Sequence, residues 1–288
     1  MKKIKYLLEF IIIISLFIII KIIGLKISQS LFSLIFKNIG PLFRSKKVCN
    51  DNLSLALPNL NKSQRDKIIN NMWANYGKIF SEYMFIKKFR EDTEFSKKII
   101  IENQEELEKI KSQKKPVIFI SGHFNNFELM AMHLEKSGIN LAAIYRPLNN
   151  KFLNPIMERI RKKYICKKQI KKGISGTKEL LKEFKIGTSI ALMIDQRVSE
   201  GIKSELFGKE ALTTTIPAQF IKKFDTFIVP IHIERLINDT FKLKIYESVK
   251  FSKDESINNI TKKLNKILEK MIMTNPDQWI WSHNRWKI

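Results

Sequence analysis

Apolar positions along the chain fall into short runs that predict alternating strands and helices. The clearest case is residues 116–134, PVIFISGHFNNFELMAMHL. Residues 117–120 are apolar and rich in β-branched side chains, which is typical of a buried strand. A Ser-Gly pair ends this strand, and either Asn125 or Asn126 can cap a helix that follows from residue 127. This stretch therefore predicts a strand, a tight turn and a helix.

Helical spacing recurs on both sides of this stretch. Apolar residues three and four positions apart predict a long helix before it and an amphipathic helix near the end of the chain. The full set of helices expected beyond residue 47 is 62–85, 102–112, 127–138, 149–164, 175–184, 216–223 and 257–273.

Strands are expected wherever β-branched residues cluster or apolar and polar residues alternate. The expected strands are 117–120, 141–145, 189–194, 227–234 and 241–249, with a loop over 201–212. We expect the last two to pair antiparallel at one edge of the sheet. The pattern predicts an α/β fold, a central mixed, mostly parallel sheet flanked by helices, with an N-terminal membrane-anchor helix.

The N-terminal segment carries the longest apolar run of the chain. Residues 1–5 are basic and residues 6–23 are almost wholly apolar, but the uninterrupted core, 10–20, is shorter than the ~20 residues that a membrane crossing needs. A snorkelling Lys21 and an interfacial Glu9 would extend it to a single crossing. No small-residue cleavage site follows, so we expect an uncleaved anchor.

Residues 27–43 are amphipathic and precede a basic cluster, which suits a helix lying in a membrane interface. We therefore divide the chain into an anchor with its interfacial helix, 1–47, and a main domain, 48–288. The alternative, in which the apolar run is a buried core helix, stays open.

Composition narrows the class of protein. The 288 residues include 44% hydrophobic residues, which indicates a folded core, and the formal net charge of +24 favours anionic partners. Cys49 and Cys166 form no disulfide framework, and the four histidines are too scattered for a metal site. No nucleic-acid-binding motif is evident. We therefore expect no metal, no cofactor and no nucleic acid, and anionic lipids or an acidic protein as partners.

His123 is the first candidate for chemistry, because it lies in the predicted turn. Glu128 lies in the first turn of the following helix and can fold back toward it. A carboxylate there would hold one ring nitrogen of the imidazole and leave the other free to accept a proton. The helix N-terminus would offer N–H groups to an oxyanion or a phosphate. The alternative is a structural histidine and an ordinary first-turn carboxylate.

Two further blocks carry charged candidates. Arg146 follows a predicted strand, and Arg159 and Arg161 lie in a strongly basic predicted helix, where a solvated helix face is the simpler interpretation. Asp195 follows the strand 189–194. Since ligands bind beyond the carboxyl ends of parallel strands, Asp195 can converge with His123.

An ordered set of motifs resembles a known family. The chain carries S-G-H-F-x-N-x-E at 121–128, Y-R-P at 145–147 with R-x-R at 159–161, and I-D-Q at 194–196. It also carries N-x-x-x-A-x-P at 52–58, F-G-x-x-A-x-T at 207–213 and P-x-Q-W-x-W-x-H-x-R-W-K at 276–287. From about residue 50 onward the chain resembles the bacterial lipid A biosynthesis (lauroyl and myristoyl) acyltransferases, within the glycerolipid acyltransferase superfamily. It departs from their best-characterised branch in a short segment at 149–155 and in Gln196-Arg197 after the aspartate.

The resemblance implies roles for the candidates. His123 would be the general base, Glu128 would orient it, Arg161 would contact an acceptor phosphate and Asp195 would organise the site. The N–H groups of residues 122–126 would hold the oxyanion. The further substrate-binding candidates are Arg146, Arg159 and Asn126.

The implied reaction moves a fatty acyl chain from acyl carrier protein to a hydroxyl of a lipid A precursor, at the bacterial inner membrane with the catalytic domain facing the cytoplasm. The implied partners are acyl carrier protein, the anionic glycolipid acceptor and inner-membrane lipids. Two alternatives stay open: an acyltransferase for another lysophospholipid or glycolipid, and a basic binding protein without chemistry.

Overall fold

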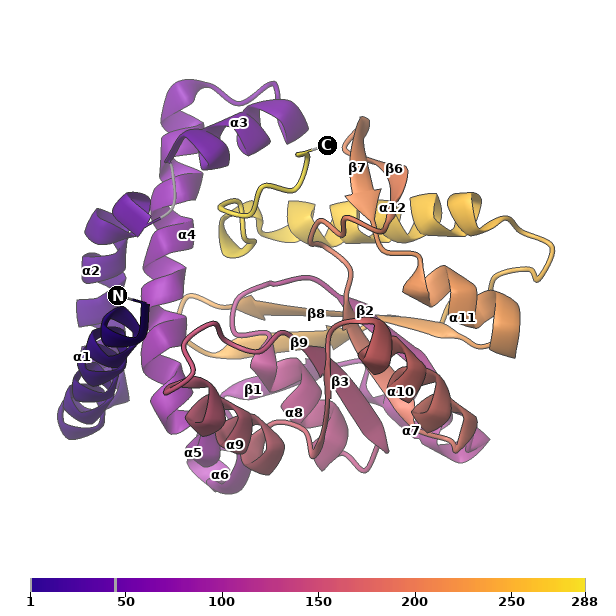
Figure 1. Ribbon diagram of the computed structural model, residues 1–288, viewed down its shortest axis with the longest axis horizontal. Coiled ribbons are helices and arrows are strands. Elements are labelled where there is room, and N and C mark those ends of the chain that lie inside the picture. Colours follow the sequence, from indigo (N-terminus) through magenta and orange to yellow (C-terminus); the bar gives the residue numbers. More distant parts are fainter. Residues whose placement is uncertain (1, 44–45, 288) are drawn as a thin grey trace.

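A mixed sheet lies at the centre of the molecule. The computed structural model describes residues 2–43 and 46–287. Within these residues the sheet has seven strands in the order β1-β9-β8-β2-β5-β3-β4 (Figure 1). The strands are β1 Ile99–Glu102, β2 Ile118–Ser121, β3 Leu141–Tyr145, β4 Lys168–Lys171, β5 Ser189–Met193, β8 Ile228–Arg235 and β9 Phe241–Ile245.

All pairs in this sheet are parallel except β8 with β9. Every residue of β2 and β8 is buried. Strands covered on both faces need apolar residues at successive positions, which is why residues 118–120 of β2 and 228–231 of β8 form continuous apolar runs. The predicted mixed, mostly parallel sheet flanked by helices is confirmed.

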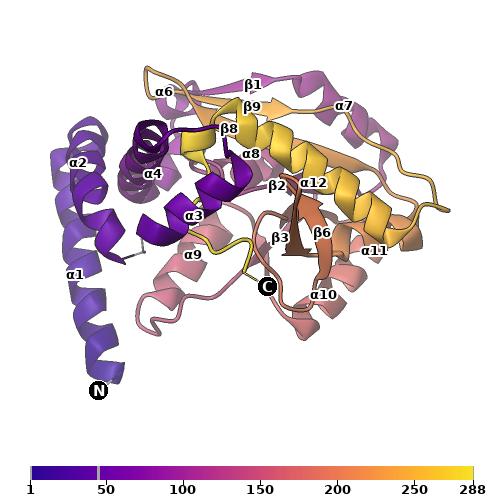
Figure 2. The same cartoon turned by 90° about the horizontal axis from the view of Figure 1, so that it is seen from above.

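Helices cover both faces of the sheet. In Figure 1, α12 lies above β8 and β9 and α8 and α9 lie below them, and in the view from above in Figure 2 α12 crosses in front of the strands. Helix α10 packs against α11, because the ring of Phe184 lies 5.3 Å from that of Phe220 and 5.0 Å from that of Phe224. The helices of the main domain after α4 are α5 Ile86–Glu91, α6 Thr93–Ser96, α7 Gln104–Gln113, α8 Glu128–Lys136, α9 Asn154–Tyr164, α10 Ile174–Lys185, α11 Ile216–Phe224 and α12 Ile257–Thr274, with short 3-10 turns at Tyr83–Phe85 and Pro276–Gln278.

The N-terminal helices stack against one end of the sheet. They are α1 Lys2–Ile23, α2 Leu25–Phe43, α3 Lys46–Ala56 and α4 Lys62–Glu82. A Cβ on Gly77 of α4 would lie 2.0 Å from the backbone oxygen of Phe32 in α2, so only glycine permits this close packing. The structure therefore joins α2 closely to the main domain, and the division at residue 47 stays a prediction.

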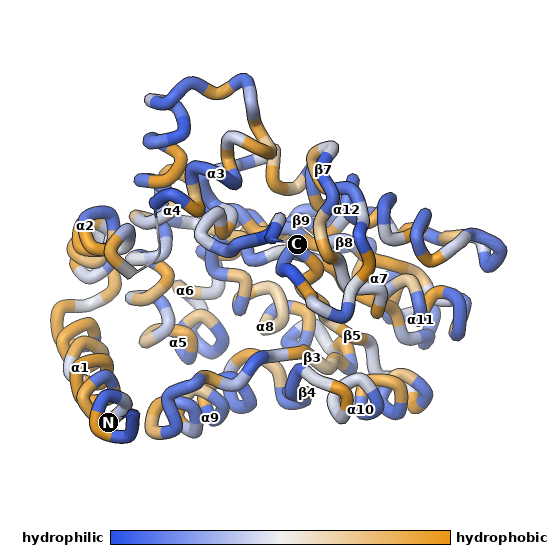
Figure 3. Tube along the Cα trace, turned by 45° about the horizontal axis from the view of Figure 1, so that its top comes forward, coloured by the Kyte–Doolittle hydropathy of each residue, from blue (hydrophilic) through white to orange (hydrophobic). Residues whose placement is uncertain are grey.

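The first helix is mostly uncovered. It is long and apolar enough to cross a membrane, yet only 11% of its most apolar window is buried. Phe17 and Ile20 pack inward, and Phe17 meets the ring of Phe80 at 5.2 Å. Its exposed apolar residues are Ile4, Leu7, Leu8, Ile11, Ile12, Ile18, Ile19 and Ile22. In Figure 3, which colours the chain by hydropathy, α1 is predominantly hydrophobic. This arrangement disfavours the buried core helix that the sequence left open.

Two predictions about strands are wrong. Residues 201–212 lie largely in an antiparallel hairpin, β6 Ile202–Leu206 and β7 Lys209–Thr213, instead of a loop. The antiparallel pair β8 and β9 does not end at a sheet edge, because the unpredicted strand β1 pairs with β9. Strand β4, at the other edge, was also not predicted.

Two helix starts also differ from the predictions. Asn125 has a left-handed φ of 41° and its side chain accepts from the Asn126 N–H at 2.6 Å, so neither asparagine caps α8, which begins at Glu128. Helix α9 begins at Asn154 instead of residue 149, with Pro155 in its first turn, where proline is well suited. The segment before it is held by Asn150, whose side chain accepts from two backbone N–H groups.

Candidate active site

The site forms at the carboxyl ends of two adjacent parallel strands. Strand β2 ends at Ser121, two residues before His123, and β5 ends at Met193, two residues before Asp195. These strands pair directly, Ser121 opposite Met193, so the residues that follow meet at one sheet edge. Parallel sheets place ligand sites at this edge, and the predicted convergence of His123 and Asp195 is confirmed.

Asp195 binds His123 twice. One carboxylate oxygen lies 2.8 Å from the ring Nδ1, and the other accepts the His123 backbone N–H at 2.8 Å. Trp279 donates its indole N–H to that second oxygen at 2.9 Å. The Asp195 side chain is fully buried, whereas the His123 ring is 20% exposed. A carboxylate only accepts, so Nδ1 carries the proton and Nε2 is the free acceptor of a neutral ring.

The carboxylate also sets the protonation of the ring. Burial lowers the pKa of His123, but the charge and hydrogen bond of Asp195, with a contribution from the charge of Glu128, outweigh burial and raise it above its usual value. Burial raises the pKa of Asp195, but His123 and the donor of Trp279 outweigh it and hold that pKa well below its usual range. The pair is therefore built to stabilise an imidazolium beside a carboxylate.

Glu128 has a different partner from the one predicted. Its Oε1 accepts from Nε of Arg161 at 2.8 Å and forms an ion pair with Nη2 at 2.8 Å. The side chains of Glu128 and Arg161 are 12% and 16% exposed. Asp195, and not Glu128, lies beside Nδ1 of His123. The prediction that Glu128 orients His123 is thus wrong in its geometry, because the helix begins at Glu128 and its side chain points across the cleft to α9. Glu128 acts on His123 only through its charge.

A cleft of about 630 Å³ opens beside these residues. Its polar lining includes His123, Glu128, Arg161, Arg146, Lys172 and Gln196, and much of the remaining wall is apolar. The side-chain nitrogen of Gln196 lies 3.4 Å from His123 Nε2. The free ring nitrogen therefore faces a space large enough for part of a lipid chain.

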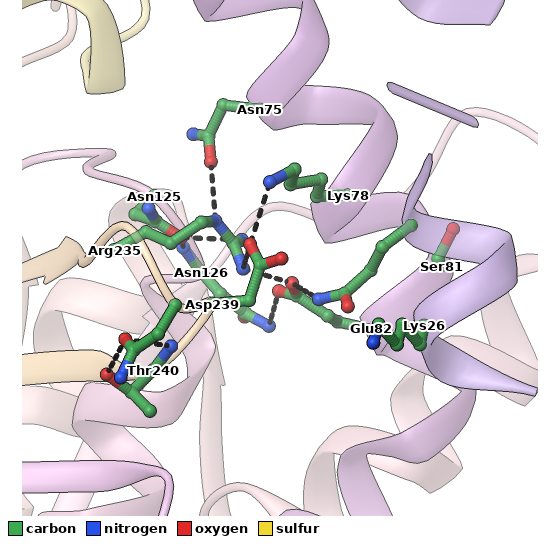
Figure 4. A network of polar contacts seen from close by, with 12 residues as sticks. Lys26, Asn75, Lys78, Ser81, Glu82, Asn125, Asn126, Arg235, Asp239 and Thr240 are labelled. Carbon is green, nitrogen blue, oxygen red and sulfur yellow. Dashed lines mark hydrogen bonds and ion pairs between the residues drawn. The ribbon is translucent and has the colours of Figure 1, made fainter. Parts of the chain in front are cut away.

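The other predicted binding residues, Arg146, Arg159 and Asn126, differ in their position relative to the cleft. Arg146 is exposed and lines the cleft, whereas Arg159 is exposed on α9 and is not among the lining residues. Asn126 is 1% exposed and donates to Glu82 at 2.9 Å, in a buried network with Asn125 and Arg235 (Figure 4). The prediction that Asn126 contacts substrate is therefore wrong, because its side chain is used to hold the turn.

Four of the backbone N–H groups that were predicted to hold the oxyanion, those of residues 123–126, already have hydrogen-bond partners in the protein. The backbone N–H groups of residues 123 and 126 donate to side-chain oxygens of Asp195 and Asn125. Those of residues 124 and 125 donate to the carbonyl oxygens of Gly122 and Gln278. None of these four N–H groups is left over for a negative oxygen beside His123.

Three residues of the site were not predicted. Trp279 donates a hydrogen bond to Asp195, and the side-chain nitrogen of Gln196 lies against Nε2 of His123. The charge of Lys172 acts to lower the pKa of His123. The tryptophans of the C-terminal motif are buried, Trp279 at 1% and Trp281 at 0% exposure, which favours core packing over membrane contact. A buried indole N–H usually has a hydrogen-bond partner, and this rule was the only signal in the sequence for the contact between Trp279 and Asp195.

The residues that the structure describes contain no candidate metal site. Among the described residues, no group of three or more His, Cys, Asp or Glu side chains is placed to hold a metal ion. Cys49 and Cys166 are both buried and unpaired with each other.

Comparison with known proteins identifies the family of this chain. The sequence profile of the family described as bacterial lipid A biosynthesis acyltransferase matches residues 1–288. The chain is 25% identical over 256 residues to the lipid A biosynthesis palmitoleoyltransferase of Escherichia coli (strain K12), covering 85% of this chain and 80% of that protein. It is 22% identical over 256 residues to the lipid A biosynthesis lauroyltransferase of the same organism, covering 85% and 79%.

Among solved structures, the chain is similar to the 1-acyl-sn-glycerophosphate (LPA) acyltransferase PlsC from Thermotoga maritima, with 17% identity and a TM-score of 0.44. That match covers 89% of this chain and 99% of the other. The resemblance seen in the sequence motifs is confirmed by the match over residues 1–288. The chain belongs to the bacterial lipid A biosynthesis acyltransferase family and has an acyltransferase role in lipid A biosynthesis.

Proposed function

We propose that this protein transfers a fatty acyl chain from the thioester of acyl carrier protein to a hydroxyl of a lipid A precursor, with His123 as general base. The observation that carries the proposal is the His123–Asp195 pair, in which a fully buried carboxylate fixes Nδ1 and leaves Nε2 toward the cleft. A histidine held in this way can accept a proton from a bound alcohol.

In the proposed reaction, His123 Nε2 removes the proton of the acceptor hydroxyl as its oxygen attacks the thioester carbonyl. The new C–O bond gives a tetrahedral oxyanion. When the oxyanion collapses, the C–S bond breaks, and the imidazolium returns its proton to the departing thiolate. Asp195 stabilises the imidazolium during this cycle, for which the raised pKa of His123 is the expected consequence.

Arg161 and Arg146 are the proposed contacts for acceptor phosphate. Both line the cleft, and a guanidinium pairs well with phosphate oxygens. Glu128 holds Arg161 through Nε and Nη2, so the guanidinium is fixed before the acceptor arrives. We therefore assign Glu128 to the positioning of Arg161. Arg159 lies outside the cleft and fits a role in the basic surface of α9.

The exposed apolar face of α1 supports attachment to the inner membrane, with the main domain on the cytoplasmic side. Glu9 interrupts that face, but it accepts from Asn150 at 3.2 Å, and Asn150 also donates to the carbonyl of Tyr6. These bonds tie the start of α1 to the segment that leads from the cleft wall into α9. The net charge of +24 favours both anionic headgroups and an acidic carrier protein.

The experiment is acyl transfer in vitro with purified protein, acyl carrier protein charged with a labelled acyl chain, and a tetraacylated lipid A precursor. We expect a pentaacyl product from the wild type and a loss in kcat of about 10²–10⁴-fold in His123→Ala. Asp195→Asn is expected to lose activity while retaining acceptor binding.

The matched control is His133→Asn, because His133 is a half-buried histidine of α8 that does not line the cleft. Full activity in His123→Ala would reject the assignment of the base. A wild type that acylates another lysophospholipid or glycolipid but not the lipid A precursor would reject the proposed acceptor and leave the base intact.

A further inference from the structure

Gln196 occupies the place where the acceptor hydroxyl must bind. Its side-chain nitrogen is 3.4 Å from His123 Nε2, on the side of the ring opposite Asp195. Because Nδ1 holds the ring proton, Nε2 accepts, and the Gln196 amide is oriented as a weak donor to it. A substrate hydroxyl that gives its proton to Nε2 has to displace this amide.

The backbone N–H groups that follow Gly122 already have acceptors within the protein. The N–H groups of residues 123–126 all donate to protein oxygens, as described above. A tetrahedral oxyanion in an acyl transfer requires donors already in place when the charge develops. Gln196 lines the cleft, is half-buried and carries two amide N–H groups next to the reacting nitrogen.

The backbone on both sides of Gln196 is held firmly. Asp195 is fixed by His123 and Trp279, and the Arg197 N–H donates to Nε2 of His283 at 3.0 Å. The backbone therefore fixes the Cα of Gln196 next to the ring, so a rotation of the side chain about that Cα would keep its amide within reach of a carbonyl that reacts beside Nε2.

We propose that Gln196 is a further catalytic residue of this reaction: its amide covers His123 Nε2 in the free enzyme and donates to the oxyanion once the acceptor hydroxyl has displaced it. The proton goes from the hydroxyl to Nε2, the C–O bond forms, and the carbonyl electron pair becomes the oxyanion that the amide N–H binds. Collapse then breaks the C–S bond as in the proposed function, on which this inference rests.

The test compares Gln196→Ala and Gln196→Glu in the acyl-transfer assay. We expect kcat to fall about 10²-fold or more in both, with little change in KM, because the lost bond is made only in the transition state. The control is Gln219→Glu, which makes the same change of charge at an exposed position of α11.

The second readout is the pH dependence of kcat/KM. An N–H donor to Nε2 favours the neutral ring, so its removal in Gln196→Ala raises the midpoint at which activity appears. A carboxylate in Gln196→Glu stabilises the imidazolium and raises that midpoint further. A residue with a merely structural role would not move it. Because Gln196→Glu is nearly isosteric, it serves even where the alanine variant is unstable.

Unchanged kcat in Gln196→Ala, or an unmoved pH midpoint in both variants, would overturn this inference. The two proposals fail separately. Loss of activity in His123→Ala together with full activity in Gln196→Ala would reject Gln196 alone, whereas full activity in His123→Ala would reject the general base.

Discussion

The buried ion pair between Glu82 and Arg235 yields the most direct test of how the turn after His123 is held. Glu82 is completely buried, and Arg235 has a side chain that is 6% exposed. The carboxylate also accepts from Gln29 of α2 at 2.6 Å and from Asn126 at 2.9 Å, and Arg235 donates to Asn125 at 3.0 Å (Figure 4). One network thus joins α2, α4, β8 and the turn.

The perturbation is a double-mutant cycle, Glu82→Met, Arg235→Met and the two together. Arg235→Met leaves the buried Glu82 carboxylate without a cation, and Glu82→Met leaves Arg235 with only Asp239 at 3.8 Å as a counter-charge among the described residues. Breaking a buried pair in this way costs about 3–5 kcal/mol of the free energy of unfolding, and the remaining Asp239 places Glu82→Met at the lower end of that range. The double variant removes both charges, so we expect its cost to fall short of the sum of the single costs by about 2 kcal/mol or more. A single variant should melt roughly 10 °C below the wild type.

The assay is denaturant unfolding in detergent, followed by tryptophan fluorescence, with thermal melting as a second measure. The control is Glu210→Met, which removes the partner of Lys203 in an exposed pair at 3.2 Å and should cost less than about 1 kcal/mol. Single effects that add within about 0.5 kcal/mol in the double variant would refute the reasoning, because they would mean that the two charges do not depend on each other.

Two further predictions concern pH. Because the pKa of His123 is raised, we expect kcat/KM to fall as the pH drops through a midpoint above about 6.5. Asp195→Asn removes the charge that raises this pKa, so it should move the midpoint down. A midpoint that stays fixed in Asp195→Asn would contradict this prediction. The same raised pKa stabilises the fold below about pH 6.5 and loses that contribution as the pH rises through the midpoint, so activity and this share of stability change in opposite directions. His232 behaves in the reverse sense: burial lowers its pKa to about 4 despite Glu234, with Lys242 and Lys244 adding to the effect. Its contribution, about 3 kcal/mol, is therefore lost as the pH falls from about 6.5 to 4. His232→Gln should reduce the pH dependence of the unfolding free energy over that range by about one proton, and an unchanged slope would count against it.

The sequence by itself determined the elements that depend on local pattern. Short, almost continuous apolar runs identified β2 and β5, because strands covered on both faces need apolar residues at successive positions. Since His123 and Asp195 each follow one of these strands by two residues, their meeting at one edge could be predicted once a parallel sheet was expected. The ordered motifs further identified the family. The edge strands β1 and β4 were not predicted, because each has only four residues: β1 is a run of three isoleucines and a glutamate, and β4 is mostly polar, so neither shows a clear period.

Only the tertiary structure decided which carboxylate meets which cation. Glu128 is five positions from His123, yet it binds Arg161, whereas Asp195, 72 positions away, binds the imidazole. Partner choice depends on where a helix begins and which strands are neighbours, and neither is encoded in sequence spacing. The backbone at Asn125 is left-handed, so α8 begins only at Glu128, and the carboxylate of Glu128 lies against Arg161 of α9. The pairing of β2 with β5 places Asp195 beside Nδ1 of His123.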